Sequence, residues 1–230
     1  MATRAGSRMD QYGVEPVIKV ITLEREYGSG GGAIAKLLAS KLGWQLWDYE
    51  LTCEIARRLK CDIRSVQQKE ERCDTTFYRL VKAFMRGSYE DRLGHNGVDL
   101  LDADQLAAMF EGIVTDIATK GNCVIVGRGA PWFLRNRSDT FHLFIYAPYE
   151  EKLRRLLEAG SSREEAEERI ERVDKEREAF VKKYYDKNWP QRDLYDMMLN
   201  SKVGDEGVCR LVLEEIGMLN DKAAALQKAG

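Results

Sequence analysis

The chain has 230 residues, a length that suits one α/β domain enlarged by helical insertions. Its 36 basic and 38 acidic residues leave a net charge of −2, so no overall field attracts nucleic acid or an anionic membrane. No apolar run approaches the ~20 residues that a membrane-spanning helix needs. We therefore expect a cytoplasmic protein that binds neither nucleic acid nor membrane, and the oligomeric state is left open.

The five cysteines and two histidines give little sign of a metal site or a disulfide framework. The cysteines form no C-x-x-C pair and their number is odd, which argues against a zinc ribbon and against paired disulfides. The histidines, His95 and His142, lie far apart in sequence. We expect reduced thiols and no dedicated protein metal site.

The first part of the chain reads as a strand, a glycine cluster, a helix and a second strand. Residues 1–16 are polar and predict a disordered tail. Val17–Leu23 is a β-branched apolar run typical of a buried strand. After the glycines, Ile34–Leu42 carries apolar residues at helical spacing and Gly43 ends the helix. Trp44–Trp47 predicts a short second strand that ends at Asp48.

The remainder alternates between helical patterns and short apolar strands. The segment from Leu51 to about Ala118 is helical in pattern, with a polar glycine-containing interruption. The later expected elements are strands at Cys123–Val126, Phe141–Ala147 and Met197–Asn200, and helices from Tyr149, over Ser162–Tyr185 and over Val208–Ile216. Strands separated by helices indicate βαβ units and a five-stranded parallel sheet.

Ligands of parallel α/β sheets bind beyond the carboxyl ends of the strands. That rule directs attention to the residues that follow the predicted strands, namely 24–32, Asp48, Arg128 and Pro148. The run Gly28-Ser29-Gly30-Gly31-Gly32 lies between the first strand and the first helix. Small residues let backbone N–H groups approach an anion, and the helix N-terminus adds partial positive charge. We expect these five residues to bind phosphate.

Two phosphate-binding motifs compete for this glycine loop. Residues 28–33 fit the dinucleotide pattern G-x-G-x-x-A, and Asp48 follows at the spacing of a ribose-binding acid. In that pattern the first glycine ends the strand, whereas here residues 24–27 intervene, which favours a phosphate-wrapping P-loop. The P-loop pattern G-x-x-x-x-G-K-[ST] is also broken, because Gly31 stands in the lysine position and neither Gly32 nor Ala33 carries a hydroxyl.

Three segments resemble the cytidylate kinase-like family, a branch of the nucleoside monophosphate kinases. They are the opening ITLEREYGSGGG, the third-strand segment VIVGRGA, and VDKEREAFVKKYYDKNWPQRDLYDMMLNS near the end. The resemblance implies a P-loop NTPase domain over about 17–217, with a helical acceptor-binding insert at about 52–100, a lid at about 160–190 and a C-terminal tail at 218–230. It also implies binding of ATP with Mg²⁺ and of an acceptor such as CMP or dCMP.

The resemblance assigns roles to three residues beyond the glycine loop. Arg128 matches the arginine that holds the acceptor phosphate, while Asp174 and Arg177 match an Asp-x-x-Arg pair that contacts the acceptor. Asp48 is a further candidate for the acceptor or, through water, for Mg²⁺. Because the loop lacks a lysine, arginines must supply the charge for phosphoryl transfer, and we expect Arg25, Arg128 and Arg177 to do so.

Two other functions remain open from the sequence. A nucleotide-binding protein with little catalysis, such as a sensor or partner module, is favoured by the missing lysine and hydroxyl. The hypothesis of a nicotinamide-dependent oxidoreductase is supported by the glycine pattern alone. The phosphate acceptor of a kinase could also be another small molecule.

The glycine loop predicts that ATP with Mg²⁺ stabilises the protein and that NAD does not. At a ligand concentration near 100 times Kd, the free energy of unfolding should rise by about 2.7 kcal/mol. A thermal-shift titration with both nucleotides measures this. Stabilisation by NAD alone would contradict the kinase interpretation.

Overall fold

The computed structural model describes residues 17–48, 51, 103–185 and 187–229. The predicted tail at 1–16 and the whole predicted acceptor-binding insert at about 52–100 lie outside this part of the chain. No helix within the described residues has the length and hydropathy required to cross a membrane.

A five-stranded, entirely parallel sheet forms the centre of the molecule, as the sequence predicts. The strand order is β2-β3-β1-β4-β5. The strands are β1 (Val20–Arg25), β2 (Gln45–Trp47), β3 (Cys123–Val126), β4 (Thr140–Tyr146) and β5 (Met197–Asn200). β1 is therefore central, and the residues that follow β3, β1 and β4 lie at the same edge of the sheet.

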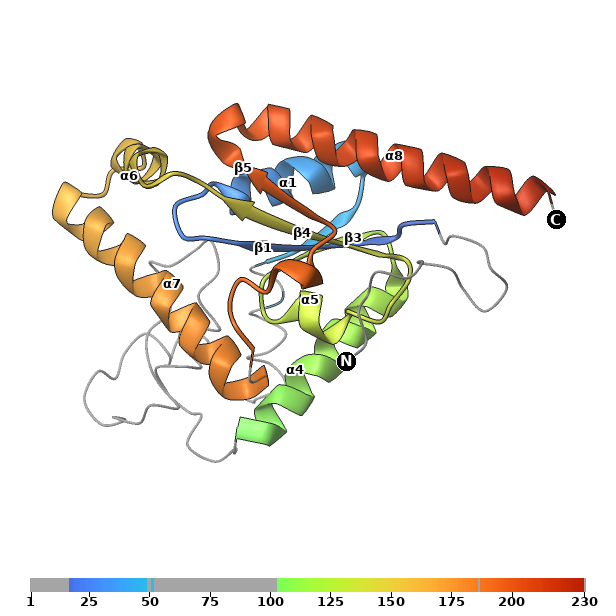
Figure 1. Cartoon of the computed structure of the whole chain (residues 1–230), viewed down its shortest axis with the longest axis horizontal. Coiled ribbons are helices and arrows are strands. Elements are labelled where there is room, and N and C mark those ends of the chain that lie inside the picture. The colour runs from blue at the N-terminus through green and yellow to red at the C-terminus, as the bar shows by residue number, and fades with distance from the viewer. Residues whose placement is uncertain (1–16, 49–50, 52–102, 186, 230) are drawn as a thin grey trace.

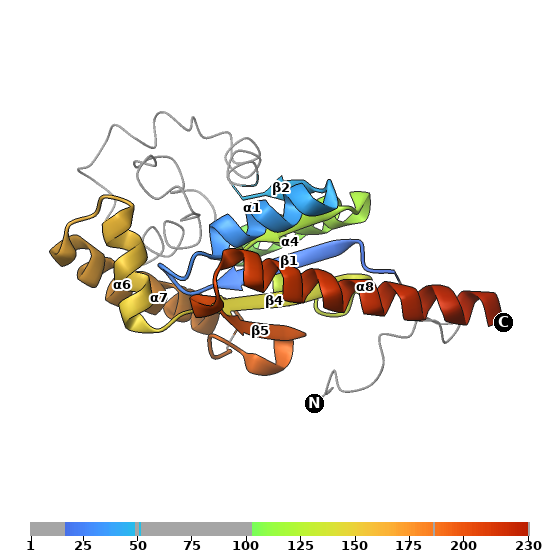
Figure 2. The same cartoon turned by 90° about the horizontal axis from the view of Figure 1, so that it is seen from above.

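Helices cover both faces of the sheet (Figure 1). One face carries α1 (Gly31–Leu42) and α8 (Asp205–Ala229), which pack against each other. The opposite face carries α4 (Ala103–Lys120) and the short α5 (Ala130–Phe133). The pair α6 (Tyr149–Glu158) and α7 (Arg163–Tyr185) extends beyond the carboxyl edge of the sheet (Figures 1 and 2).

Alternation along the strands divides the core into two halves. On β1, Ile21 and Leu23 belong to the cluster that contains α1 and α8, whereas Val20 belongs to the cluster that contains α4 and α5. Because neighbours in a strand point to opposite faces, a parallel strand covered on both sides buries the side chains of both faces. The strands β1 and β3 are buried along their whole length, which fixes the position of their carboxyl ends.

The first strand is longer at its end than the sequence predicts. Glu24 and Arg25 pair with Phe144 and Ile145 of β4, so both are strand residues rather than loop residues. The long neighbouring strand β4 supplies these backbone partners. The sequence does not show this pairing, because the side chains of Glu24 and Arg25 are polar and are typical of a loop. Only Glu26 and Tyr27 separate the strand from Gly28.

The C-terminal ends of α1 and α8 are determined in different ways, one by local sequence and the other by tertiary contacts. α1 ends where predicted, because Gly43 adopts φ 65° and its N–H bonds the last turn. α8 continues to Ala229, through residues predicted to form a tail. Ala223 is fully buried, and the side chain of Asn220 accepts a 2.7 Å hydrogen bond from the Ile18 N–H. These contacts hold the far half of α8 against the segment that leads into β1.

Candidate functional site

The glycine loop is held in shape by its own backbone and by Ser29. Ser29 is fully buried, and its hydroxyl donates a 2.8 Å hydrogen bond to the carbonyl oxygen of Glu26. Gly30 has φ 79° and no side chain caps the first turn of α1. The early N–H groups of a helix have no intrahelical partner, so this turn presents donors and partial positive charge to an anion.

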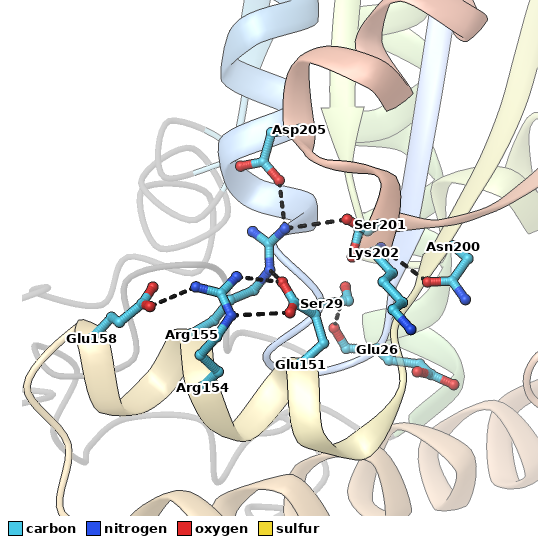
Figure 3. A network of polar contacts seen from close by, with 10 residues as sticks. All are labelled: Glu26, Ser29, Glu151, Arg154, Arg155, Glu158, Asn200, Ser201, Lys202 and Asp205. Carbon is cyan, nitrogen blue, oxygen red and sulfur yellow. Dashed lines mark hydrogen bonds and ion pairs between the residues drawn. The ribbon is translucent and has the colours of Figure 1, made fainter.

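Arg155 lies directly over Gly30 at the start of α1. A Cβ atom at residue 30 would overlap the Arg155 guanidinium, so this approach requires glycine there. Arg155 Nε donates to Glu151 over 2.9 Å, and Nη2 donates to Asp205 over 2.8 Å. The guanidinium thus bridges α6 to the beginning of α8 beside the loop (Figure 3). The sequence reasoning missed this residue, although its place on the helix after β4 was a possible signal.

Glu151 anchors both arginines of α6 (Figure 3). It accepts hydrogen bonds from Arg154 and from Arg155, and these lower the pKa of its carboxyl group. Arg154 also donates to Glu158 and is half exposed. Only Arg155 therefore faces the glycine loop.

The side chain of Arg25 runs from the start of α1 to the end of β3. Its Cβ lies against Gly31, and its Nη1 would be 2.5 Å from a Cβ atom placed on Gly127. Gly127 has φ 66°, so it supplies both the turn and the space that the guanidinium needs. Arg25 is 7% exposed. Its charge therefore lies between the glycine loop and the loop that follows β3.

Arg128 is buried in a backbone conformation that is uncommon for its type. It is 5% exposed and adopts φ 59°, in the left-handed region. Such strain persists where the surrounding structure imposes it, and it is frequent at functional sites. Burial, opposed in part by the negative charge of Asp48 and aided by the positive charges of Arg25 and Arg177, lowers the pKa of the Arg128 guanidinium to about 9. The charged form therefore gains from any anion that binds beside it.

The fold gathers Asp48, Arg25 and Arg177 around Arg128. Asp48 is buried at the end of β2 and acts electrostatically on Arg128, as do Arg25 and Arg177. Arg177 Nη1 donates to the carbonyl oxygen of Arg25 over 3.0 Å. Three guanidinium groups consequently share the carboxyl edge of β1 and β3, next to the glycine loop.

Asp174 contacts the glycine loop through a compact ion network. Its Oδ1 accepts from the Tyr27 N–H over 2.8 Å and from Arg177 over 2.9 Å. Lys152 Nζ lies 2.7 Å from Glu26 Oε2 and 3.6 Å from Asp174 Oδ2. The network ties α6 and α7 to the loop. Lys152 and Glu26 were not singled out as site residues from the sequence, because their contact with each other crosses more than 100 positions of chain.

The chain belongs to the cytidylate kinase-like family, whose model matches residues 20–203. The family resemblance noted in the sequence is thereby confirmed. No curated protein sequence matches the chain.

The fold has counterparts among solved structures. An uncharacterized protein from Eubacterium ventriosum ATCC 27560 is similar at a TM-score of 0.62 and 21% identity, over 86% of this chain and 98% of that one. Shikimate kinase from Bacteroides thetaiotaomicron matches at a TM-score of 0.48 and 17% identity, over 86% and 98%. The family match and the five-stranded parallel sheet, with its glycine loop between β1 and α1, show a P-loop fold.

Lys152→Met should destabilise the protein by about 1–3 kcal/mol, because Glu26 and Asp174 would keep their negative charges without this cation. The loss should fall below that of a fully enclosed pair, since the Glu26 side chain is 26% exposed. Urea denaturation measures the change.

Arg163→Met is the matched control, because the Arg163–Glu167 pair is exposed at 65% and 43%. Its loss should stay below about 1 kcal/mol. The double variant Glu26→Gln/Lys152→Met should be less destabilised than the sum of the single variants. Equal, small losses for Lys152→Met and Arg163→Met would contradict the network's role.

Proposed function

We propose that this protein transfers the γ-phosphoryl group of ATP to a nucleoside monophosphate, with CMP or dCMP as the first candidates. The observation that carries the proposal is the cluster of Arg25, Arg128 and Arg177 beside a glycine loop at the N-terminus of α1. Phosphoryl transfer requires positioning and positive charge around the migrating group more than covalent chemistry. Both are supported by these residues.

The donor phosphates would bind the N–H groups of residues 28–32. The base of ATP would lie farther out, beside the plane of Arg155 and the segment that follows β5. In that segment the Ser201 carbonyl accepts from Arg155 over 3.3 Å, and Val203 is 61% exposed. A planar guanidinium and an exposed apolar side chain suit an aromatic ring.

The acceptor phosphate would bind Arg128. Its planar fork can hold two phosphate oxygens, and an incoming dianion would offset the like charges of Arg25 and Arg177. Asp48 counters part of the charge before the acceptor binds. This assignment follows the position of Arg128 after β3, away from the first turn of α1.

Arg25 would act at the point of transfer between donor and acceptor. An oxygen of the acceptor phosphate attacks the γ-phosphorus, the bond to the β–γ bridging oxygen breaks, and ADP leaves with that electron pair. A phosphate dianion needs no base to remove a proton. The charge spread over the γ-phosphoryl oxygens in this step is stabilised by guanidinium groups already held in place.

Magnesium fits this arrangement as a companion of ATP. Mg²⁺ keeps several waters and is bound through substrate phosphates and one or two carboxylates. No group of three or more His, Cys, Asp or Glu side chains suited to a metal occurs within the described residues. Asp48 is a carboxylate at the carboxyl edge of the sheet, where it could contact Mg²⁺ through water. The ion would neutralise part of the negative charge of the ATP phosphates.

A nucleotide-binding protein with little catalysis is the second candidate. Two cations near the loop, Lys152 and Arg155, are already engaged with acidic side chains. If they stay engaged when ATP binds, the cations that remain for catalysis among the described site residues are Arg25, Arg128 and Arg177. Turnover of ATP in the presence of nucleoside monophosphates separates the two candidates.

Arg128→Ala should weaken the acceptor far more than ATP. The expected loss in acceptor binding is about 1.5–3 kcal/mol, the range for hydrogen bonds to a charged group. Titration calorimetry with CMP and with ATP measures both. An equal loss for the two ligands, or unfolding of the variant, would indicate a structural salt bridge instead.

Arg25→Ala should lower kcat at least tenfold, about 1.4 kcal/mol of transition-state stabilisation, because Arg25 replaces the missing loop lysine. Lys36→Ala is the control, since Lys36 is exposed on α1, more than a turn past the loop. A coupled assay of ADP release measures both variants. A damaging Lys36→Ala or a silent Arg25→Ala would refute the assignment.

A further inference from the structure

One edge of the Arg155 guanidinium group is directed at the start of α1. A Cβ atom placed on Gly30 would overlap Nη1 and would lie 2.9 Å from Cζ. Gly30 is the N-cap residue of α1, and no side chain caps the first turn of that helix. Two groups that attract anions, the guanidinium edge and the helix N-terminus, therefore face the same point beside the glycine loop.

The other donors of Arg155 are held by oxygen atoms of the protein (Figure 3). Nε donates to Glu151 over 2.9 Å, and Nη2 donates to Asp205 over 2.8 Å and to the Ser201 carbonyl over 3.3 Å. Among the described residues, no acceptor is hydrogen-bonded to Nη1. The N–H groups that Arg155 can offer to a ligand are thus the ones nearest Gly30.

The two carboxylates restrain Arg155 relative to different parts of the molecule. Glu151 lies one turn away on the same helix, so this pair moves with α6. Asp205 is the first residue of α8, and α8 packs against α1. The bond to Asp205 therefore fixes the guanidinium relative to the helix whose N-terminus would bind the donor phosphates.

The Asp205 carboxylate also lies at the glycine loop itself. Its Oδ1 is 3.3 Å from a Cβ position on Gly30. A negative charge there repels a phosphate, although the side chain of Asp205 is 31% exposed and water screens part of the repulsion. Two effects of Asp205 on a bound phosphate thus have opposite signs, one direct and the other through Arg155.

We infer that Asp205 is a positioning residue of the donor site, which holds Nη2 of Arg155 so that the Nη1 edge meets the phosphates of the donor nucleotide. The inference rests on the proposed function, because it deepens the donor site of that reaction. The hydrogen bonds of a guanidinium lie in its plane and stacking uses its face. Arg155 can therefore contact the phosphates with its edge and the base of ATP with its face.

Glu206 provides a matched comparison in the same turn of α8. It carries the same charge one residue further along, but its carboxylate pairs with Lys41 over 3.2 Å and its side chain is 73% exposed. A general effect of acidic charge at the start of α8 would be shared by Asp205 and Glu206. An effect transmitted through Arg155 belongs to Asp205.

The test is a double-mutant cycle on ATP affinity, measured by titration calorimetry on the full chain with Mg²⁺. With Arg155 present, Asp205→Asn should weaken ATP binding about three- to tenfold. In an Arg155→Met background, Asp205→Asn should leave ATP affinity unchanged or raise it, because only the repulsion of the phosphates is then removed. Glu206→Gln should leave ATP affinity unchanged in both backgrounds.

The readouts separate positioning from a merely structural role. Asp205→Asn should not change CMP affinity, because the proposed acceptor site is at Arg128, and Asp205→Glu should recover part of the lost ATP affinity. The cycle is repeated with Asp205→Ser, so that the outcome does not depend on the folding of one variant. The same factor in both backgrounds, tighter ATP binding by Asp205→Asn alone, or an equal loss of ATP and CMP affinity would overturn the inference.

ADP release in the presence of nucleoside monophosphates tests the proposed function separately. Coupling between Asp205 and Arg155 without phosphoryl transfer would overturn the kinase proposal and leave the positioning role standing at a nucleotide-binding site. Phosphoryl transfer without this coupling would do the reverse. Failure of the unaltered protein to bind ATP would overturn both.

Discussion

The electrostatic constraint on which the site depends is the approach of three guanidinium groups at one edge of a parallel sheet. Arg25, Arg128 and Arg177 carry like charges, and burial makes that proximity costly for Arg128 in particular. Asp48 and Glu24 offset part of it. Guanidinium groups do not lose their proton readily, so the remaining imbalance is relieved by binding an anion. The folded core thus places positive charge at this edge in a form that suits an anion.

The backbone around this cluster is arranged to permit the close approaches. Gly30 makes room for Arg155, and Gly127 makes room for Arg25, both with positive φ. Arg128 itself adopts a left-handed conformation without being glycine. The site therefore depends on the turns after β1 and β3 as much as on its charged side chains, because those turns decide which guanidinium faces which loop.

The ion network of Glu26, Lys152, Asp174 and Arg177 connects the site to the helices beyond the sheet. It binds α6 and α7 to the backbone of the glycine loop at Tyr27 and Arg25. A displacement of α7 would therefore move the glycine loop and the guanidinium group of Arg177 together. On the other side of the loop, Arg155 makes an equivalent connection to α8 through Asp205.

Sequence alone was enough to predict the five strands, the α1 stop at Gly43, the glycine loop and the position of Arg128, because these follow from local periodicity and backbone preference. It underestimated β1, since only β4 supplies the partners of Glu24 and Arg25. Tertiary structure alone decided the contacts of Arg155, Lys152 and Trp189. Their contacts, such as Trp189 with Glu24 across 165 positions, join side chains whose spacing in the chain carries no periodic signal.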